Sequence, residues 1–205
     1  FTAALQLTPN FTDAHFNLGN TLKEHGNLSA AIASFNTVLQ LKPDYAEAHF
    51  NLGNALKEQD DLNAAIDSFC RALQFKSNFQ EARINLGNVL QEKGDLTAAI
   101  STYTKALELM PNFPEAQANL STAELLAGNY KKGWETYEYR LQCKTGPSTL
   151  NANPLCKQWS NETIFPGSQV LLVSEQGLGD TLQFMRYAIA LKSQGVSVSL
   201  CSPKK

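Results

Sequence analysis

Hydrophobic residues in the first two thirds of the chain recur at the three- and four-residue spacing of a helix, and the whole pattern repeats at a fixed period. The clearest marker is an Asn-Leu pair that begins at Asn17, Asn51, Asn85 and Asn119, so the period is 34. Residues 12–45 and 46–79 share 19 of 34 aligned residues. A fixed period of roughly 20 to 50 residues is typical of a solenoid, in which each unit buries its apolar face against the next. The sequence therefore predicts a row of stacked repeats.

Each repeat is expected to be a hairpin of two helices. The first helical pattern ends at a residue suited to a tight turn: Gly26, Asp60, Gly94 or Gly128. The second pattern ends near a proline in two units, at Pro43 and Pro111. Small residues allow the two helices to approach closely; they are Gly19, Ala31, Gly53, Ala65, Gly87 and Ala99. A large ring is expected to fill the angle between the helices: Phe35, Phe69, Tyr103 and Tyr137.

This set of positions resembles the tetratricopeptide repeat over residues 1 to about 142. The Leu-Gly pair, the small residue twelve positions later, the ring four positions beyond and the terminal proline all fall in the register of that repeat. The resemblance implies a mostly α fold, an α-solenoid of antiparallel helix hairpins. It divides the solenoid into a partial repeat at 1–11, full repeats at 12–45, 46–79 and 80–113, and a degenerate capping repeat at 114–142. The last repeat departs from the pattern at Ser121, Glu124, Gly133, Arg140 and Thr145.

The first residues match the second helix of a repeat whose first helix would lie upstream. Phe1 and Pro9 stand one full period before Phe35 and Pro43. A solenoid end without a neighbour or a polar cap leaves apolar surface uncovered. We therefore expect exposed apolar surface at Phe1 and Leu5, and self-association through this truncated end.

A polar stripe is predicted along the first helix of each repeat. At about 100° per residue, four polar positions fall within roughly 60° of one another, opposite the apolar side of the helix. These positions are Asp13, Asn17, Asn20 and Glu24, then Glu47, Asn51, Asn54 and Glu58, then Glu81, Asn85, Asn88 and Glu92, and Asn119 continues the row. Stacked hairpins are expected to join the stripes into a polar ladder.

The asparagines are candidates for binding extended peptide, because an Asn side chain carries one acceptor and two donors and can pair with the backbone of any sequence. The family that these repeats most resemble is the repeat region of the O-linked N-acetylglucosamine transferases, in which Asn at this position lines the concave surface and holds substrate polypeptide. That resemblance implies a peptide-binding set at Asn17, Asn51, Asn85 and Asn119, with Asn20, Asn54 and Asn88 beside it. The other interpretation is that these amides keep the surface soluble or bond to neighbouring helices.

Charges along the expected groove give a weak preference for a basic or neutral partner. The predicted groove charges are Asp13, Glu47, Glu81, Lys23 and Lys57. The carboxylates attract basic groups, and the two lysines dilute that field.

Two further features of the repeats carry alternatives. Leu125 and Leu126 replace polar residues of the earlier units, so either a ligand side chain or the following segment is expected to pack against them. His15 and His49 occupy the position where this kind of repeat usually has Trp. Because they lie one whole repeat apart, we expect a packing role for both, and we expect no metal site.

The C-terminal third has a different organisation. Residues 143–168 lose the period and gather proline, glycine, serine and asparagine, which is typical of a linker. Residues 169–174 are then predicted to be a buried strand, 175–180 a glycine-rich loop, 181–194 a helix that ends at Gly195, and 196–201 a second strand. This order predicts a β-α-β unit with parallel strands, a short fragment of a Rossmann-like domain over 169–205.

The loop between the first strand and the helix contains Gly177, Gly179 and Asp180. Neither common nucleotide-binding fingerprint is complete, because Leu182 stands where a third glycine is needed and no Gly-Lys-Ser/Thr follows. The stretch from Glu175 to Asp180 is similar to the opening of a heptosyltransferase-like, two-lobed glycosyltransferase domain that follows tetratricopeptide repeats in bacteria. That resemblance implies that Asp180 is the catalytic base and that the two glycines form an acceptor loop. Asp180 is equally suited to be the N-cap of the helix.

The same resemblance places the sugar donor mainly on a second lobe, which the short segment 169–205 cannot supply. We therefore expect no cofactor in this chain and a nucleotide sugar only in a longer parent protein. Residues 1–205 alone are not expected to be an active enzyme.

Composition narrows the class of partner. The 205 residues include 17 Lys and Arg against 19 Asp and Glu, a net charge of -2. Without a basic surface, neither nucleic acid nor an anionic membrane is an expected partner. The cysteines at 70, 143, 156 and 201 show no C-x-x-C spacing, so we expect reduced thiols and a cytoplasmic protein.

Three functions remain open from the sequence. The first is a protein-protein interaction module that holds an extended peptide in the concave groove. The second is a glycosyltransferase whose repeats recruit a protein or saccharide acceptor. The third is a structural scaffold that assembles with itself.

Overall fold

The computed structural model describes residues 11–137, 139, 166–173 and 188–201. The chain divides into two compact units, Phe1–Gln142 and Cys143–Lys205, which we call the repeat unit and the C-terminal unit. The repeat unit contains α2 (Thr12–Glu24), α3 (Leu28–Leu41), α4 (Ala46–Glu58), α5 (Leu62–Phe75), α6 (Gln80–Glu92), α7 (Leu96–Leu109), α8 (Pro114–Leu126) and α9 (Tyr130–Thr136). The C-terminal unit contains β1 (Gln169–Val173) and β2 (Ser197–Cys201).

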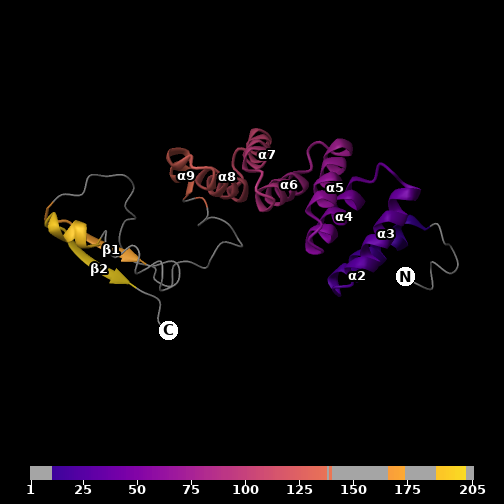
Figure 1. The fold of residues 1–205 in the computed structure, drawn as a ribbon, viewed down its shortest axis with the longest axis horizontal. Coiled ribbons are helices and arrows are strands. Elements are labelled where there is room, and N and C mark those ends of the chain that lie inside the picture. Colours follow the sequence, from indigo (N-terminus) through magenta and orange to yellow (C-terminus); the bar gives the residue numbers. More distant parts are fainter. Residues whose placement is uncertain (1–10, 138, 140–165, 174–187, 202–205) are drawn as a thin grey trace. The chain divides into compact units, whose positions relative to one another are not determined.

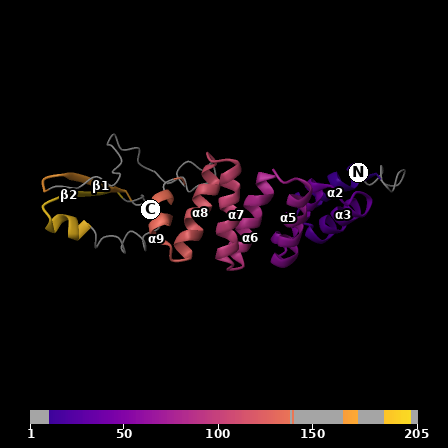
Figure 2. The same ribbon diagram turned by 90° about the horizontal axis from the view of Figure 1, so that it is seen from above.

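The helices of the repeat unit confirm the period that the sequence predicts. The first helices of the hairpins begin at residues 12, 46, 80 and 114, and the second helices begin at 28, 62, 96 and 130. Successive starts therefore differ by one full period in both series. Figure 1 shows the hairpins following one another along the repeat unit in sequence order, and Figure 2 shows neighbouring helices from α5 to α8 side by side. No helix among the described residues is long and apolar enough to cross a bilayer.

The turn inside each hairpin closes one helix and starts the next within a few positions of the chain. After α2, Gly26 N–H donates to the Lys23 carbonyl and Asn27 N–H donates to the Leu22 carbonyl, both at 2.9 Å. This is a Schellman motif, which needs a left-handed residue at the Gly26 position. The Asn27 side chain then accepts from Ala30 N–H and caps α3. The left-handed position is occupied in all four hairpins, by Gly26 (φ 75°), Asp60 (φ 67°), Gly94 (φ 88°) and Gly128 (φ 82°).

The two helices of a hairpin meet where a glycine lies against an aromatic ring. A Cβ built on Gly53 would lie 2.8 Å from Phe69 Cε1, and one on Gly87 would lie still closer to Tyr103 Cε1. Phe69 and Tyr103 are completely buried, as is Phe35 opposite Gly19. The ring therefore fills the space that a side chain on the glycine would need.

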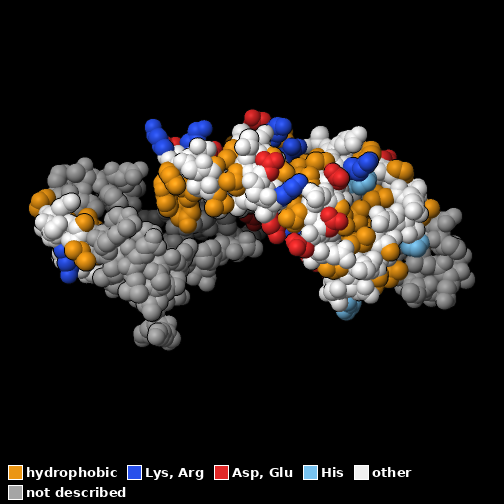
Figure 3. Space-filling view, viewed as in Figure 1, with side chains coloured by type: hydrophobic (Ala, Val, Ile, Leu, Met, Phe, Trp, Pro, Cys, Tyr) orange, Lys and Arg blue, Asp and Glu red, His pale blue; other side chains and the backbone are white. Residues whose placement is uncertain are grey.

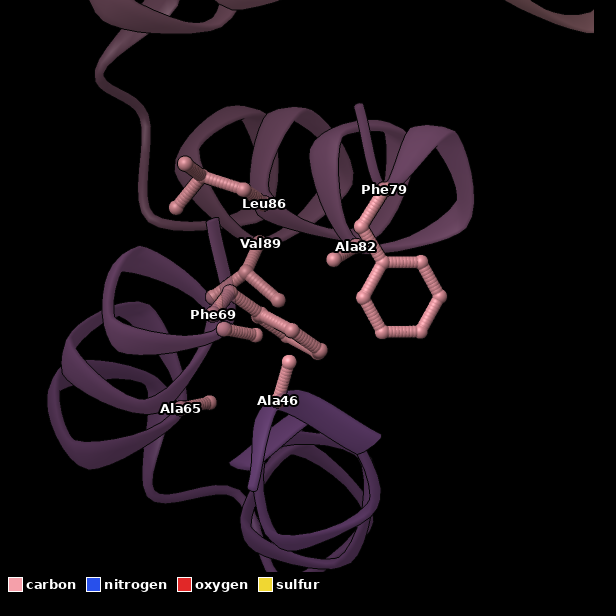
Figure 4. Close-up of a cluster of buried hydrophobic side chains, with 8 residues drawn as sticks. Ala46, Ala65, Phe69, Phe79, Ala82, Leu86 and Val89 are labelled. Carbon is pink, nitrogen blue, oxygen red and sulfur yellow. The ribbon is translucent and has the colours of Figure 1, made fainter. Parts of the chain in front are cut away.

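The hydrophobic core is a series of clusters, each of which joins one hairpin to the first helix of the next. In the cluster drawn in Figure 4, Phe69 and Ala65 from α5 pack with Ala46 from α4 and with Val89 from α6. Equivalent clusters join α2 and α3 to α4, and α6 and α7 to α8. Burial therefore depends on the adjacent repeat, as expected of a solenoid.

The two helices of the last hairpin also approach closely, although the larger and the smaller of two facing residues have changed places. Ser121 stands where earlier repeats have glycine, and Gly133 stands where they have alanine. Ser121 is completely buried, and its hydroxyl donates to the Gly133 carbonyl at 2.9 Å. The departures that the sequence attributes to a degenerate repeat are thus compatible with an α8–α9 hairpin.

One expected core ring behaves differently in this hairpin. Tyr137 lies just beyond the end of α9 and is only partly buried, whereas the equivalent ring in each earlier repeat is completely buried. Its ring makes a T-shaped contact with Trp134, with centroids 4.9 Å apart. The earlier rings are also covered by the first helix of the following repeat, and the described residues contain no such helix after α9.

The C-terminal unit contains two parallel strands, paired in register from Gln169 with Ser197 to Val173 with Cys201. Residues 188–193 are helical and end at a turn in which Gly195 has φ 81°. The strands and the final turn agree with the sequence prediction within one residue at each described boundary. Ala188 and Val196 are buried in this unit.

Candidate functional site

The polar stripe lies on the layer of first helices. Each of α2, α4 and α6 contacts the next first helix along the chain, and no comparable contact joins the second helices within the described residues. In a curved stack, helices on the inner side lie closer together than helices on the outer side. The first helices therefore form the inner layer of the repeat unit. The stripe positions predicted from the helical period are exposed or partly exposed in every repeat, and none of them is buried.

Asparagines of successive repeats are hydrogen-bonded in pairs along this inner layer. The Asn51 side chain donates through Nδ2 to Asn20 Oδ1 at 2.9 Å. The two following pairs repeat this geometry: Asn85 to Asn54 at 2.8 Å and Asn119 to Asn88 at 2.9 Å. Six of the seven predicted peptide-binding asparagines are therefore bonded to a neighbouring helix, which is the second interpretation that the sequence left open. No partner of the Asn17 amide is found among the described residues.

Pairing uses only part of the hydrogen-bonding capacity of each amide. An Asn side chain has two N–H donors and an acceptor oxygen with two lone pairs. In the first pair, one N–H of Asn51 and one lone pair of Asn20 are occupied, so Asn51 Oδ1 and both N–H groups of Asn20 have no protein partner within the described residues. The pairs hold the amides in place and leave groups that a ligand backbone could use.

The third pair differs because a tyrosine takes part. Tyr103 replaces the phenylalanine of the earlier repeats, and its hydroxyl donates to Asn88 Oδ1 at 2.7 Å. Asn88 Oδ1 thus accepts from both Tyr103 and Asn119. Burial raises the pKa of Tyr103 far above its ordinary value, so the hydroxyl remains a donor. The amide at this pair is held from two sides.

Three of the five predicted groove charges are engaged in ion pairs, two of them between repeats and one within a repeat. Lys23 lies 3.7 Å from Glu58, and Lys57 lies 3.8 Å from Glu92, so each lysine binds a carboxylate of the next first helix. Glu47 is bonded to Lys76 at 2.7 Å, and this hydrogen bond lowers the pKa of the Glu47 carboxyl. Such partly exposed pairs are worth up to about 1 kcal/mol each.

The remaining predicted charges, Asp13 and Glu81, have no ion-pair partner within the described residues. Met110 stands one period after Lys76, so the third repeat lacks the lysine that would bind Glu81. In Figure 3, acidic side chains gather at the lower edge of the middle of the repeat unit. The stripe therefore keeps negative charge that the protein itself does not neutralise.

The stripe becomes apolar at its α8 end. Thr122 and Leu126 occupy the positions that are Asn and Glu in the earlier repeats. The Leu126 side chain is 60% exposed, and Leu125 is partly buried in the α8–α9 hairpin. Of the apolar pair singled out in the sequence, Leu126 is the residue that a ligand can reach.

In α4, α6 and α8, the side chain at one equivalent position is bonded to the connection that precedes the helix, a role that the sequence did not reveal. His49 Nε2 lies 2.9 Å from the Pro43 carbonyl, and Gln117 Nε2 donates to the Pro111 carbonyl at 3.0 Å. Arg83 makes the same bond to the carbonyl six positions before it. Burial lowers the pKa of His49, since desolvation disfavours the charged ring. Three chemically different side chains thus donate the same kind of hydrogen bond in three repeats. The sequence signal that could have revealed it is the shared spacing of six positions between donor and carbonyl.

Several predicted residues lie outside the described part of the chain. Asp180, Gly177 and Gly179 fall in the stretch 174–187, and Phe1 and Leu5 fall in 1–10. Their assigned roles remain predictions. Among the described residues, no group of three or more His, Cys, Asp or Glu is placed to hold a metal ion.

Comparison with protein families identifies the repeat. A family model described as TPR repeat matches residues 19–60 and 87–123. Two further models, both described as tetratricopeptide repeat, match residues 1–33 and 46–79. A search of curated proteins gave no match.

Solved structures share the architecture of the repeat unit. A crystal structure of MamA is 28% identical, with a TM-score of 0.65, and the alignment covers 69% of this chain and 82% of MamA. MamA of Desulfovibrio magneticus RS-1 is 19% identical, with a TM-score of 0.63 and coverage of 67% and 78%. PilF of Pseudomonas aeruginosa is 22% identical, with a TM-score of 0.61 and coverage of 68% and 64%. The last two identities are too low to carry more than the fold.

Proposed function

Because this chain is built of tetratricopeptide repeats, we propose that it is a protein-interaction module whose amide stripe binds an extended peptide. The repeats and their similarity to MamA support a protein-interaction or scaffold role. The observation that carries the finer proposal is the row of paired asparagines on the inner layer. Three pairs of asparagines each join one first helix to the next. In each pair, N–H donors and one amide oxygen have no protein partner among the described residues.

Paired amides suit this role better than isolated ones. An unpaired Asn on a helix surface has several rotamers, and a ligand must select one of them at a cost in entropy of up to about 1.5 kcal/mol per side chain. A bond to the neighbouring helix fixes the amide before the ligand arrives. Backbone N–H and C=O groups of an extended peptide can then pair with Asn51 Oδ1 and with the Asn20 amide group, whatever side chains the peptide carries.

The dimensions agree with a short peptide. Contacting helices lie about 8 to 10 Å apart, so four first helices span roughly 24 to 30 Å. An extended chain advances about 3.3 Å per residue, so about seven to nine residues cover this distance. A dodecapeptide is therefore long enough to occupy the whole stripe.

Substitution of the amides tests the proposal. A fluorescein-labelled pool of dodecapeptides with randomised sequence is titrated with the full chain, and binding is followed by fluorescence anisotropy. We expect Asn17→Ala to weaken binding without loss of stability, because no bond between helices is removed. Asn51→Ala with Asn85→Ala should weaken binding further. The double substitution also removes two such bonds and should cost about 1 to 3 kcal/mol of stability.

A matched control separates binding from stability. Gly53→Ala is expected to lower stability by a similar amount while leaving every amide of the stripe in place. This control should bind the peptide pool as the unmodified chain does, at a temperature where all variants are folded. If the asparagine variants and the unmodified chain bind equally well, the peptide site lies elsewhere.

The C-terminal unit gives a second candidate function, a glycosyltransferase that the repeats supply with acceptor. The parallel strands β1 and β2 on either side of a helical segment support the predicted β-α-β order. On this proposal Asp180 is the base, and the sugar donor binds to chain beyond Lys205. A coding sequence that continues past Lys205 into a second β-α-β lobe would favour the transferase. A stop codon directly after Lys205 would exclude it.

Self-assembly is the third candidate, and it concerns the first residues of the chain. The predicted apolar surface at Phe1 and Leu5 would associate with a second copy. Sedimentation velocity over a range of concentrations measures this directly. Adding a first helix upstream of Phe1 should abolish any association that depends on these residues.

A further inference from the structure

The charges of the inner layer identify a class of peptide, and this inference rests on the proposed function. The stripe has four positions in each of α2, α4, α6 and α8, and seven of these sixteen residues are acidic. The seven are Asp13, Glu24, Glu47, Glu58, Glu81, Glu92 and Glu115. No lysine or arginine occupies a stripe position. Counted over whole helices, α2, α4, α6 and α8 hold eight carboxylates against three cationic side chains, Lys23, Lys57 and Arg83, so the layer that carries the amides has a net charge of -5 (3 minus 8).

The second helices do not share this imbalance. The α3 helix has no charged residue, α5 has Asp67 and Arg71, and α7 has Lys105 and Glu108. The net charge of each of these three helices is zero. Since the whole chain has a net charge of only -2, the acidic excess belongs to one layer. A general property of the protein, such as solubility, would not require this separation.

Ion pairs neutralise only part of the negative charge of the stripe. Glu47, Glu58 and Glu92 are bound by lysines of neighbouring helices or turns. Asp13, Glu24, Glu81 and Glu115 have no ion-pair partner within the described residues. These four carboxylates lie in the same rows as the asparagines, within roughly 60° around each helix. Their summed charge gives the stripe a negative potential, which attracts a ligand of opposite charge.

We infer that the amide stripe binds basic, extended peptides, with lysine or arginine side chains placed beside the unpaired carboxylates. The two sets of groups act on different parts of the ligand. The amides bond to the peptide backbone and supply affinity without selecting a sequence. The carboxylates select side-chain charge, and the two lysines beside the stripe, Lys23 and Lys57, are already paired with Glu58 and Glu92.

The α8 end adds a second element to the ligand. Leu126 takes the position of Glu24, Glu58 and Glu92, and its side chain is 60% exposed. An extended peptide that carries basic residues beside Glu24, Glu58 and Glu92 would meet the exposed Leu126 at the same position of α8. The fitting ligand is thus basic along most of its length and hydrophobic at one end.

Three labelled peptides test the charge preference. Each is a dodecapeptide on one shared uncharged background, with Lys, Gln or Glu at every third position, and each is titrated with the full chain. In about 50 mM salt we expect the Lys peptide to bind at least about tenfold more tightly than the Glu peptide, from several weak contacts acting together. The difference should shrink at about 500 mM salt, since the Debye length falls below the distance between exposed charges.

Two variants with the same change in net charge locate the effect. The stripe variant carries Asp13→Asn, Glu24→Gln, Glu81→Gln and Glu115→Gln. The control variant carries Asp44→Asn, Asp67→Asn, Glu108→Gln and Glu135→Gln, which lie off the stripe and have no ion pair within the described residues. The stripe variant should lose the preference for the Lys peptide, and the control variant should keep it. Circular dichroism confirms that both are folded.

The outcomes separate this inference from the proposed function. If all three peptides bind equally and Asn51→Ala with Asn85→Ala weakens them all, the amide stripe binds peptide without charge selection and the inference is wrong. The inference also fails if the control variant loses the preference as fully as the stripe variant does. If none of the peptides binds, the proposed function fails and the inference fails with it.

Discussion

Replacing Gly53 with alanine tests whether the hairpin geometry depends on the contact between glycine and ring. The added Cβ would lie 2.8, 2.9 and 3.0 Å from three carbons of the Phe69 ring, well inside the 3.5 to 4.0 Å that is about optimal for carbon atoms. Phe69 is completely buried among residues of α4, α5 and α6, so its ring has no free space into which to move. Either the ring must leave its rotamer or the two helices must separate.

Two opposing terms set the magnitude. Overpacking of a well-packed core costs about 1 to 3 kcal/mol. Alanine in place of a helical glycine gains roughly 1 kcal/mol of helix propensity. Because the Phe69 ring is completely buried, we expect a cost in the upper part of that range, about 2 to 3 kcal/mol. Gly53→Ala should therefore lower the free energy of unfolding by about 1 to 2 kcal/mol, or roughly 2 to 8 °C in melting temperature. Gly87→Ala should cost more, because its Cβ would lie closer to the Tyr103 ring than the Gly53 Cβ lies to Phe69.

Urea denaturation followed by circular dichroism at the helical band measures these differences. A second substitution identifies the cause: Phe69→Leu alone should destabilise the chain, but in the Gly53→Ala background it should restore part of the loss, since the smaller side chain leaves room for the new methyl group. The size of this coupling comes from the double-mutant cycle. If Gly53→Ala is as stable as the unmodified chain, or if the two substitutions are additive, the ring is not what requires a glycine at this position.

Two further substitutions test the left-handed turn residue Asp60 and the bond that His49 makes. Asp60 is the one residue other than glycine with positive φ within the described residues. Asp60→Gly should therefore raise the free energy of unfolding by about 0.5 to 1 kcal/mol, measured as a higher urea midpoint. An unchanged midpoint would show that Asp60 is unstrained. The lowered pKa of His49 means that the unfolded chain binds the proton more readily, so stability should be complete above the ordinary histidine pKa and should fall as the pH decreases below it. Melting curves between pH 7 and pH 5 should show a smaller decrease for His49→Gln, which keeps the donor that Gln117 provides in its own repeat, and equal decreases would contradict the assignment.

The sequence predicted the hairpins well because their signals are local. Helical spacing, a turn residue such as Gly26 and an N-cap such as Asn27 act within one helix or across a few positions of the chain. The orientation of the stripe followed from the helical period alone. These features depend on no distance between different repeats.

Contacts between repeats were harder to predict for a physical reason. The bond from Asn51 to Asn20 depends on how far one first helix is rotated and displaced relative to the next, and the pattern within a single helix does not contain that information. The pairing of Lys57 with Glu92 has the same origin. One structural role is shared by His49, Arg83 and Gln117, whose side chains have little in common besides an N–H group. Because the residue types differ, the sequence did not show that the three make equivalent bonds.

Both connections in each repeat are closed by hydrogen bonds, and this limits how the protein can change length. In the turn after α2, Asn27 ends one helix through its backbone and begins the next through its side chain, so an inserted residue would separate the two. In the connection before α4, an insertion between Pro43 and His49 would pull the ring away from its carbonyl. Gain or loss of one complete period leaves every such bond intact. Copy number, in whole repeats, is therefore the natural way for this scaffold to vary its reach.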